Sequence, residues 1–114
     1  MNVERFLPLT PVVLEIALSL AAGERHGYEI MQDVERRTDG AIVLHPGTLY
    51  RALGRLLDQG LIEELDERPA GGADDERRRY YRLTALGQAV ARAEVDRLTS
   101  QIAAARRLFR GGRA

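Results

Sequence analysis

Hydrophobic residues recur at helical spacing in three stretches of the first half of the chain. Residues 11–22 are apolar nearly all round, which is typical of a helix in the middle of a core. Thr10 precedes this helix and can cap its free amides. A second helix is predicted over residues 27–37. A third opens at residues 46–48, with Thr48 or the backbone just before it as the cap.

Two strand-like segments and a long helix make up the rest of the chain. The predicted strands cover residues 61–67 and 79–83, and a polar turn separates them. The order helix, helix, helix, strand, strand, helix predicts a mainly α fold with a small two-stranded β wing, that is, a winged helix-turn-helix. We place this domain at residues 1–83 and a long C-terminal helix at residues 84–110, within one compact unit.

The charges are segregated along the chain. The formal net charge is zero, which by itself argues against a nucleic-acid partner. Residues 58–76, however, hold eight acids and a single base, Arg68, whereas residues 77–82 hold four arginines and no acid. Because phosphate binding depends on where the charge sits, this distribution is compatible with nucleic-acid binding.

The third helix turns its leucines to one side and leaves cations on the other. The apolar stripe consists of Leu49, Leu53, Leu56 and Leu57. The outer side then carries Tyr50, Arg51 and Arg55, and the two arginines are neighbours because they are four positions apart. An arginine fork can bond two acceptors of guanine in the major groove, which is worth about 1–3 kcal/mol of discrimination. The alternative is that both arginines are simply solvated.

The segment RRRYYR at residues 77–82 is the second candidate for DNA contact. Alternation along a strand puts Arg77, Arg79 and Tyr81 on one side, with Arg78, Tyr80 and Arg82 on the other. In a wing, one set packs on the domain and the other faces phosphates, which gives affinity without sequence information. Two alternatives remain. The arginines can protect a strand edge, or they can pair with the acids at residues 74–76, which would repel DNA if they point the same way.

Three segments resemble the phenolic acid decarboxylase regulator (PadR) family. They are HGYEIMQDV (26–34), GTLYRALGRLLDQGLI (47–62) and RRYYRLTALG (78–87), and together they cover most of residues 9–90. The combination is far more specific than any one segment. The resemblance implies a winged helix-turn-helix protein, usually a repressor, that dimerises through a C-terminal helix. The single closing helix is similar to that of the shorter members.

The family pattern also implies roles for individual residues. The DNA-facing start of the recognition helix would hold Thr48, Tyr50 and Arg51. Tyr28 would lie at the start of the second helix, near the phosphate backbone. The wing would hold Arg78 and Arg79. Four further positions look structural in this scheme: Tyr80, Tyr81, Leu83 and Gly87.

The last helix carries an apolar seam of its own. Its members recur at spacings of four, three, four, three and four: Ala91, Val95, Leu98, Ile102, Ala105 and Phe109. This pattern is short for an independent coiled coil. A helix of about 25 residues, close to 37 Å long, overhangs so small a domain. We therefore predict a homodimer, in preference to packing of the seam on its own domain. A two-fold dimer would read a roughly palindromic operator.

Catalytic, metal and cofactor chemistry find little support in the sequence. Cysteine is absent. His26 and His45 have no third ligand at metal spacing, and Ser19 and Ser100 have no base at hand. We expect no enzyme activity, no metal and no cofactor. The N-terminus lacks the features of a signal peptide, and no apolar run is long enough to span a bilayer, so we expect a cytoplasmic protein without membrane contact.

The main alternative function is a winged helix that binds a protein instead of DNA, because folds do not fix function. An apolar outer face on the third helix would favour a protein partner, whereas Tyr50, Arg51 and Arg55 favour DNA. A small-molecule effector held between the subunits is compatible with DNA binding, but the sequence does not show one. The chain has no tryptophan, so stacking of an effector on indole is excluded.

Overall fold

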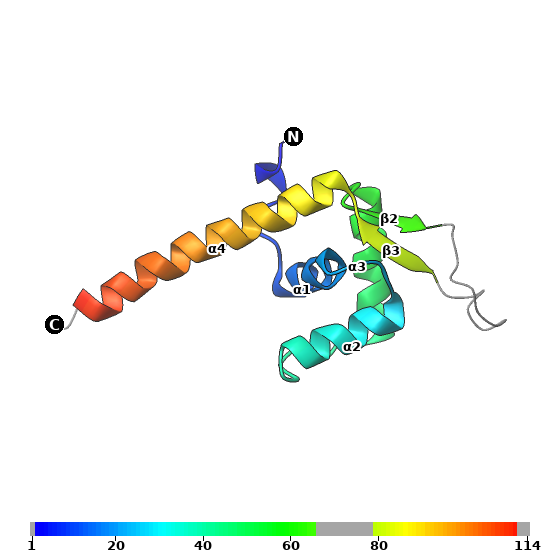
Figure 1. Cartoon of the computed structure of the whole chain (residues 1–114), viewed down its shortest axis with the longest axis horizontal. Coiled ribbons are helices and arrows are strands. Elements are labelled where there is room, and N and C mark those ends of the chain that lie inside the picture. The colour runs from blue at the N-terminus through cyan, green and yellow to red at the C-terminus, as the bar shows by residue number, and fades with distance from the viewer. Residues whose placement is uncertain (1, 66–78, 112–114) are drawn as a thin grey trace.

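The computed structural model describes residues 2–65 and 79–111 of the chain. The helices are a short 3₁₀ turn η1 (Glu4–Phe6), α1 (Pro11–Ala21), α2 (Gly27–Arg37), α3 (Pro46–Asp58) and α4 (Ala85–Gly111). The strands are β1 (Arg25–His26), β2 (Ile62–Leu65) and β3 (Tyr80–Leu83). The first three helices and the sheet form one body, and α4 runs out from it (Figure 1). The predicted order of elements is confirmed.

The sheet has three antiparallel strands in the order β1-β3-β2, one strand more than predicted. The two strands of the predicted wing pair as expected, with Ile62 opposite Leu83. The additional strand pairs Arg25 with Tyr81 and His26 with Tyr80. Sequence periodicity could not reveal a two-residue strand, because alternation needs several residues to show.

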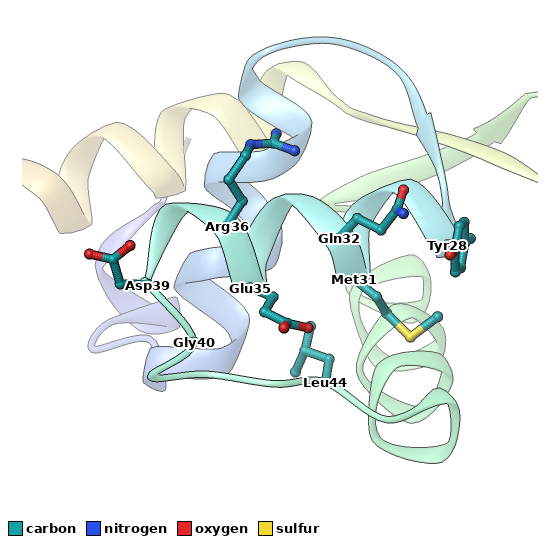
Figure 2. A pocket seen from close by; sticks show the side chains of 8 residues that line it. All are labelled: Tyr28, Met31, Gln32, Glu35, Arg36, Asp39, Gly40 and Leu44. Atoms are coloured by element: carbon teal, nitrogen blue, oxygen red, sulfur yellow. The ribbon is translucent and has the colours of Figure 1, made fainter.

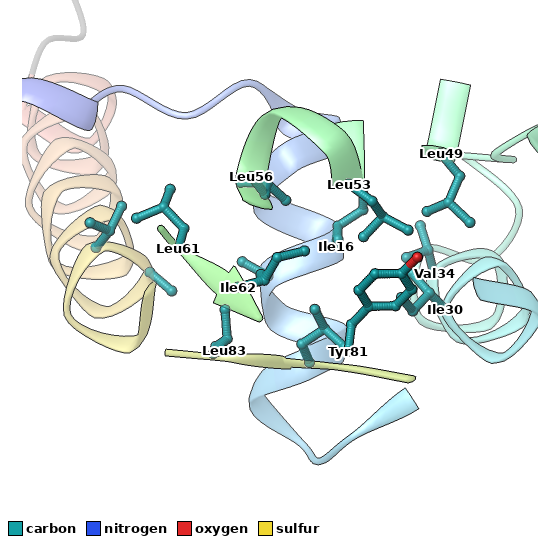
Figure 3. Packing of buried hydrophobic residues seen from close by; sticks show 14 of the residues in the cluster. Ile16, Ile30, Val34, Leu49, Leu53, Leu56, Leu61, Ile62, Tyr81 and Leu83 are labelled. Atoms are coloured by element: carbon teal, nitrogen blue, oxygen red, sulfur yellow. The ribbon is translucent and has the colours of Figure 1, made fainter. Parts of the chain in front are cut away.

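The hydrophobic core lies where the inner faces of α1, α2 and α3 meet the sheet (Figure 3). Ile16, Ile30 and Leu49 have no exposed surface, and β3 closes the core with Tyr81, which is 2% exposed. Burial of each such aliphatic side chain stabilises the fold by about 1.5–3 kcal/mol. Three leucines of the predicted α3 stripe are buried, while Leu57 is only half-buried.

The helix starts agree with the sequence in one case and differ in another. The Thr10 hydroxyl accepts a hydrogen bond of 3.2 Å from the amide of Val13, as predicted. Of the two caps predicted for α3, Thr48 is wrong, because the residue before the helix is His45 and no side chain among the described residues caps it. Pro46 takes the first helical position, where its fixed φ angle favours the helix. Thr48 therefore lies inside the first turn.

The start of α4 is fastened to the end of α3. The Thr84 hydroxyl donates to the carbonyl of Gly60 over 2.6 Å and accepts from the amide of Gly87 over 3.0 Å. A Cβ atom at Gly87 would collide with the carbonyl group of Leu61, lying 2.9 Å from its carbon. Glycine is therefore required here for close backbone packing, which agrees with the structural role predicted for Gly87.

Two buried carboxylates hold separate segments of the chain together. Asp33 on α2 accepts a 2.8 Å hydrogen bond from Arg37, whose guanidinium also donates to Glu15 on α1 over 2.8 Å. Burial by itself raises the pKa of Asp33, but the hydrogen bonds and the positive charges of Arg37 and Arg25 outweigh it and leave this pKa lowered. The ion pairs thus hold α2 against α1.

The second buried carboxylate, Glu94, fastens the N-terminal segment to α4. It is 1% exposed. Its oxygens accept hydrogen bonds from Arg97 over 2.6 Å and from the amide of Leu9 over 2.9 Å. The hydrogen bond from Arg97 lowers the pKa of Glu94, burial opposes this, and the Leu9 amide lowers it further.

None of the helices in residues 2–65 and 79–111 is long and apolar enough to cross a membrane.

Candidate nucleic-acid interface

The outer face of α3 presents polar and cationic side chains to solvent. Thr48, Tyr50, Arg51 and Arg55 are all exposed, whereas the leucines on the opposite face are buried. Within the part of the chain that the structure describes, no acidic side chain forms an ion pair with Arg51 or Arg55. Both guanidinium groups are therefore available to an anionic or hydrogen-bond-accepting partner, as the helical spacing predicted.

The arginines and the tyrosine lie on different sides of this face. Arg51 and Arg55 border a shallow groove of about 180 Å³ that α3 forms with the start of α1, where Thr10 also lines it. Tyr50 instead reaches the beginning of α2. A Cβ atom at Gly27 would lie only 2.9 Å from Cζ of Tyr50, so a larger residue at that position would displace the Tyr50 ring.

The contact between Tyr50 and Gly27 joins α3 to the start of α2. His26 caps α2 by accepting a hydrogen bond from the Glu29 amide, while the Glu29 side chain accepts one from the His26 amide. Tyr28 follows directly and is 60% exposed. Sequence reasoning missed this contact. The glycine between the cap and Tyr28 was the signal that could have suggested a close neighbour there.

The described arginines of the wing, unlike those of α3, have acidic neighbours. Arg79 is 70% exposed, and its Nε lies 3.9 Å from Oε2 of Glu64. Arg82 forms ion pairs with Glu63 at 3.2 Å and with Glu24 at 3.8 Å. The sequence did not predict these partners on β2 and before β1. Arg78 and the acids at residues 74–76 lie outside the described residues.

Tyr81 marks the junction between the wing and α3. Burial raises the pKa of its hydroxyl, and the negative charge of Glu64 and the neighbouring Tyr50 raise it further, while Arg79 partly offsets both. Tyr81 thus interacts with Tyr50 of α3, Glu64 of β2 and Arg79 just before β3. The burial of Tyr81 and Leu83 agrees with their predicted structural roles.

The predicted seam of α4 divides into a covered and an uncovered part. Ala91 is buried in the core of its own domain, so the outward seam begins only at Val95. Leu98 and Ala105 are half-buried. Ile102 is 51% exposed and Phe109 is 87% exposed. At its inner end the seam borders a groove of about 250 Å³, whose apolar lining residues are Val95, Ala91, Leu18, Ala21 and Leu83. The outer half of α4 therefore carries apolar surface that its own domain does not cover.

Residues 13–93 match the profile of the transcriptional regulator PadR-like family. This chain belongs to the PadR-like family. It is similar to the solved structure of a transcriptional regulator from Clostridium thermocellum, at 31% identity over 80% of this chain and 87% of that chain, with a TM-score of 0.65. The family consists of transcriptional regulators, not enzymes, so the PadR-like chain is a transcriptional regulator.

Two other solved structures share the fold of this PadR-like chain. A PadR family transcription regulator from Clostridium difficile is 23% identical over 88% of this chain and 99% of that chain, with a TM-score of 0.72. The PadR of Bacillus subtilis, solved in complex with operator DNA, is 21% identical over 75% of this chain and 48% of that chain, with a TM-score of 0.64. The family and the winged helix fold predicted from the sequence are confirmed.

A large open hollow of about 890 Å³ lies on the outer side of α2 in this PadR-like chain (Figure 2). Tyr28 lines one end of it, and Glu35 and Asp39 line the other part, along the connection to α3. Arg36 also lines the hollow, so its charges are of both signs. The described residues contain no group of three His, Asp or Glu side chains that could hold a metal ion.

Proposed function

We propose that this PadR-like regulator binds duplex DNA sequence-specifically, as a homodimer on a roughly palindromic operator, and represses transcription from it. The observation that carries the proposal is the exposed outer face of α3. There Arg51 and Arg55 have no acidic partner among the described residues. The related Bacillus subtilis PadR, whose structure was solved with operator DNA, supports the proposal.

The dimensions of α3 suit the major groove. The helix has 13 residues, which corresponds to about 20 Å, and the groove is about 12 Å wide. The start of the helix would enter with Thr48, Tyr50 and Arg51, and the guanidinium groups would read guanine edges. Tyr28 at the start of α2 and Arg78 and Arg79 of the wing would bind the phosphates on either side, which positions the helix without specifying sequence.

The uncovered half of α4 supplies the proposed dimer contact. Ile102 and Phe109 of the seam, and Leu108 next to it, are exposed apolar residues on a helix that extends beyond the body of the protein. A second copy of the helix would cover the seam, because apolar residues at spacings of three and four, such as Ile102, Ala105 and Phe109, pair well in a coiled coil. The two recognition helices would then reach half-sites about 34 Å apart, one turn of DNA.

The alternative, a winged helix that binds a protein through α3, has less support. The outer face of α3 offers two arginines, a threonine and a half-exposed tyrosine instead of an aliphatic patch. A small-molecule effector between the subunits stays a prediction.

The first experiment is a gel shift of the purified protein against the DNA upstream of its own gene. Excess competitor DNA and a salt series separate specific from non-specific binding, and a scrambled duplex of equal length is the control. A competitor-resistant complex that weakens steeply with salt, with a palindromic footprint, is expected. Equal binding of the operator and the scrambled duplex would contradict sequence-specific function and make a protein partner for α3 the next candidate.

The dimer is tested by two matched charge insertions on α4. Ile102→Glu places a carboxylate in the seam, whereas Ala104→Glu places the same group on the opposite side of the helix, also on an exposed residue. Sedimentation should show a monomer for the first variant and a dimer for the second, and operator binding should be lost only in the first. Two dimeric variants would exclude the seam as the contact.

A further inference from the structure

An acidic residue of the wing faces the same side as one of its DNA-binding candidates. Glu64 on β2 lies opposite Tyr81 on β3, and directly opposed residues of antiparallel strands project to the same face. Arg79 precedes Tyr81 by two positions and therefore projects to this face as well. The Arg79 Nε and the Glu64 Oε2 are 3.9 Å apart. Both side chains thus lie on the side of the wing that faces α3.

Tyr50 of α3 and the wing pair lie around the buried Tyr81. The Tyr50 ring lies against Gly27 at the start of α2. Tyr50, Glu64 and Arg79 all affect the Tyr81 hydroxyl. In the proposed complex α3 enters the major groove, and Arg79, on the side of the wing that faces α3, is then on the side that meets the flanking phosphates.

The pair between Arg79 and Glu64 is weak enough for a phosphate to replace it. Its distance is close to the 4 Å limit of an ion pair, and the side chains are 70% and 38% exposed. By contrast, the buried carboxylate of Glu94 binds Arg97 at 2.6 Å. Exposed pairs contribute about 0–1 kcal/mol, whereas an arginine and a phosphate can form two parallel hydrogen bonds.

We propose that Glu64 competes with a DNA phosphate for Arg79 on the side of the wing that faces α3. The inference rests on the proposed DNA binding. A phosphodiester bound there takes the guanidinium of Arg79 away from Glu64 and remains beside that carboxylate, which repels it. Glu64 therefore weakens the anchoring of the wing on any duplex. Its removal frees Arg79 from this competitor.

Two neighbouring acids provide the matched test. Glu64→Gln and Glu63→Gln remove the same charge from adjacent residues of β2. Glu63, however, pairs with Arg82 on the opposite face of the sheet. At low salt, Glu64→Gln should raise the affinity for a scrambled duplex about fivefold. It should also steepen the salt dependence of binding by up to about one phosphate contact. Glu63→Gln should change the affinity by less than about twofold.

The role of Arg79 is tested by repeating the substitution in an Arg79→Gln background. There Glu64→Gln should change affinity no more than Glu63→Gln does in the native chain. An equal rise for the two glutamine variants, or an undiminished effect of Glu64→Gln without Arg79, would overturn the proposal. A further outcome is that the wild type binds operator and scrambled duplex equally, while Glu64→Gln, but not Glu63→Gln, binds duplex more tightly than the wild type. In that case the inference stands and the proposal of sequence-specific recognition fails. Absence of duplex binding by every variant would contradict both.

Discussion

The arginines of α3 and those of the wing have different surroundings, although both groups are exposed. Arg51 and Arg55 have no acidic partner among the described residues. Arg79 and Arg82 lie beside Glu64 and Glu63 of the neighbouring strand. The difference arises because strand pairing brings acids from one segment opposite bases from another, while the outer face of a helix meets only solvent. Net charge, which is zero here, therefore does not measure how many cations a DNA phosphate can reach.

The largest effect is expected from an unpaired arginine. Arg51→Ala should lower operator affinity by about 1–3 kcal/mol, because it removes a bidentate contact to a base. It should lower affinity for a scrambled duplex much less. Titrations of both duplexes by fluorescence anisotropy measure the two losses, and Arg107→Ala, an exposed residue on the side of α4 away from the seam, is the control. Equal losses on the two duplexes would show that Arg51 binds phosphate instead of reading sequence.

An arginine paired with a buried acid should affect folding and not DNA contact. Glu94→Gln should lower the free energy of unfolding by about 1–2 kcal/mol at neutral pH, because Arg97 loses its charged acceptor. The folded-state pKa of Glu94 is depressed, so its contribution is fully present above the usual value of 4.5 and is lost as the pH falls through the folded-state pKa. Urea unfolding of both proteins from pH 7 downward should show the difference shrinking below that value.

Asp96→Asn on the exposed side of the same helix is the control for Glu94 and should have little effect. A stability difference that stays constant as the pH falls would argue that the Glu94 substitution acts through packing and not through charge.

A weakly paired arginine of the wing should have a smaller effect on binding. Arg79→Ala should weaken operator and scrambled duplex by the same factor, about threefold at low salt, because a phosphate contact carries no sequence information. The salt dependence should become shallower by less than one phosphate contact. Binding measured from low to moderate salt gives both numbers. A loss confined to the operator would move Arg79 from anchoring to sequence reading.

The smallest effect is expected at Arg82. It is held by Glu63 and Glu24 on the face of the sheet away from Tyr81. Arg82→Ala should change the affinity for either duplex by less than about twofold, since exposed pairs contribute little. A loss as large as that of Arg79→Ala would show that both faces of the wing approach DNA, and the distinction drawn from strand register would not hold.

Local patterns predicted most of the fold, and pairings across the chain explain what they missed. The leucine spacing of α3 and the tyrosines of β3 indicated the elements correctly because each pattern lies within one segment. The short strand at Arg25 and the ion pairs of the wing depend on which residues face each other after folding. Ala91 fits the α4 seam by spacing, yet it is buried by its own domain. The contact of Tyr50 with Gly27 likewise joins two helices whose relative position no local pattern encodes.

The close packing at Gly87 has a geometric consequence for the proposed dimer. Thr84 and Gly87 lie at the start of α4, a helix of 27 residues that is about 40 Å long. Thr84 is hydrogen-bonded to Gly60, and Gly87 packs against Leu61, in the turn that follows α3. A rotation of about 5° at this joint would displace the far end of such a helix by roughly 3.5 Å. In the proposed dimer, one glycine would thus set the angle between α4, which would pair the subunits, and α3, which would meet DNA, and so the half-site spacing that the dimer could span.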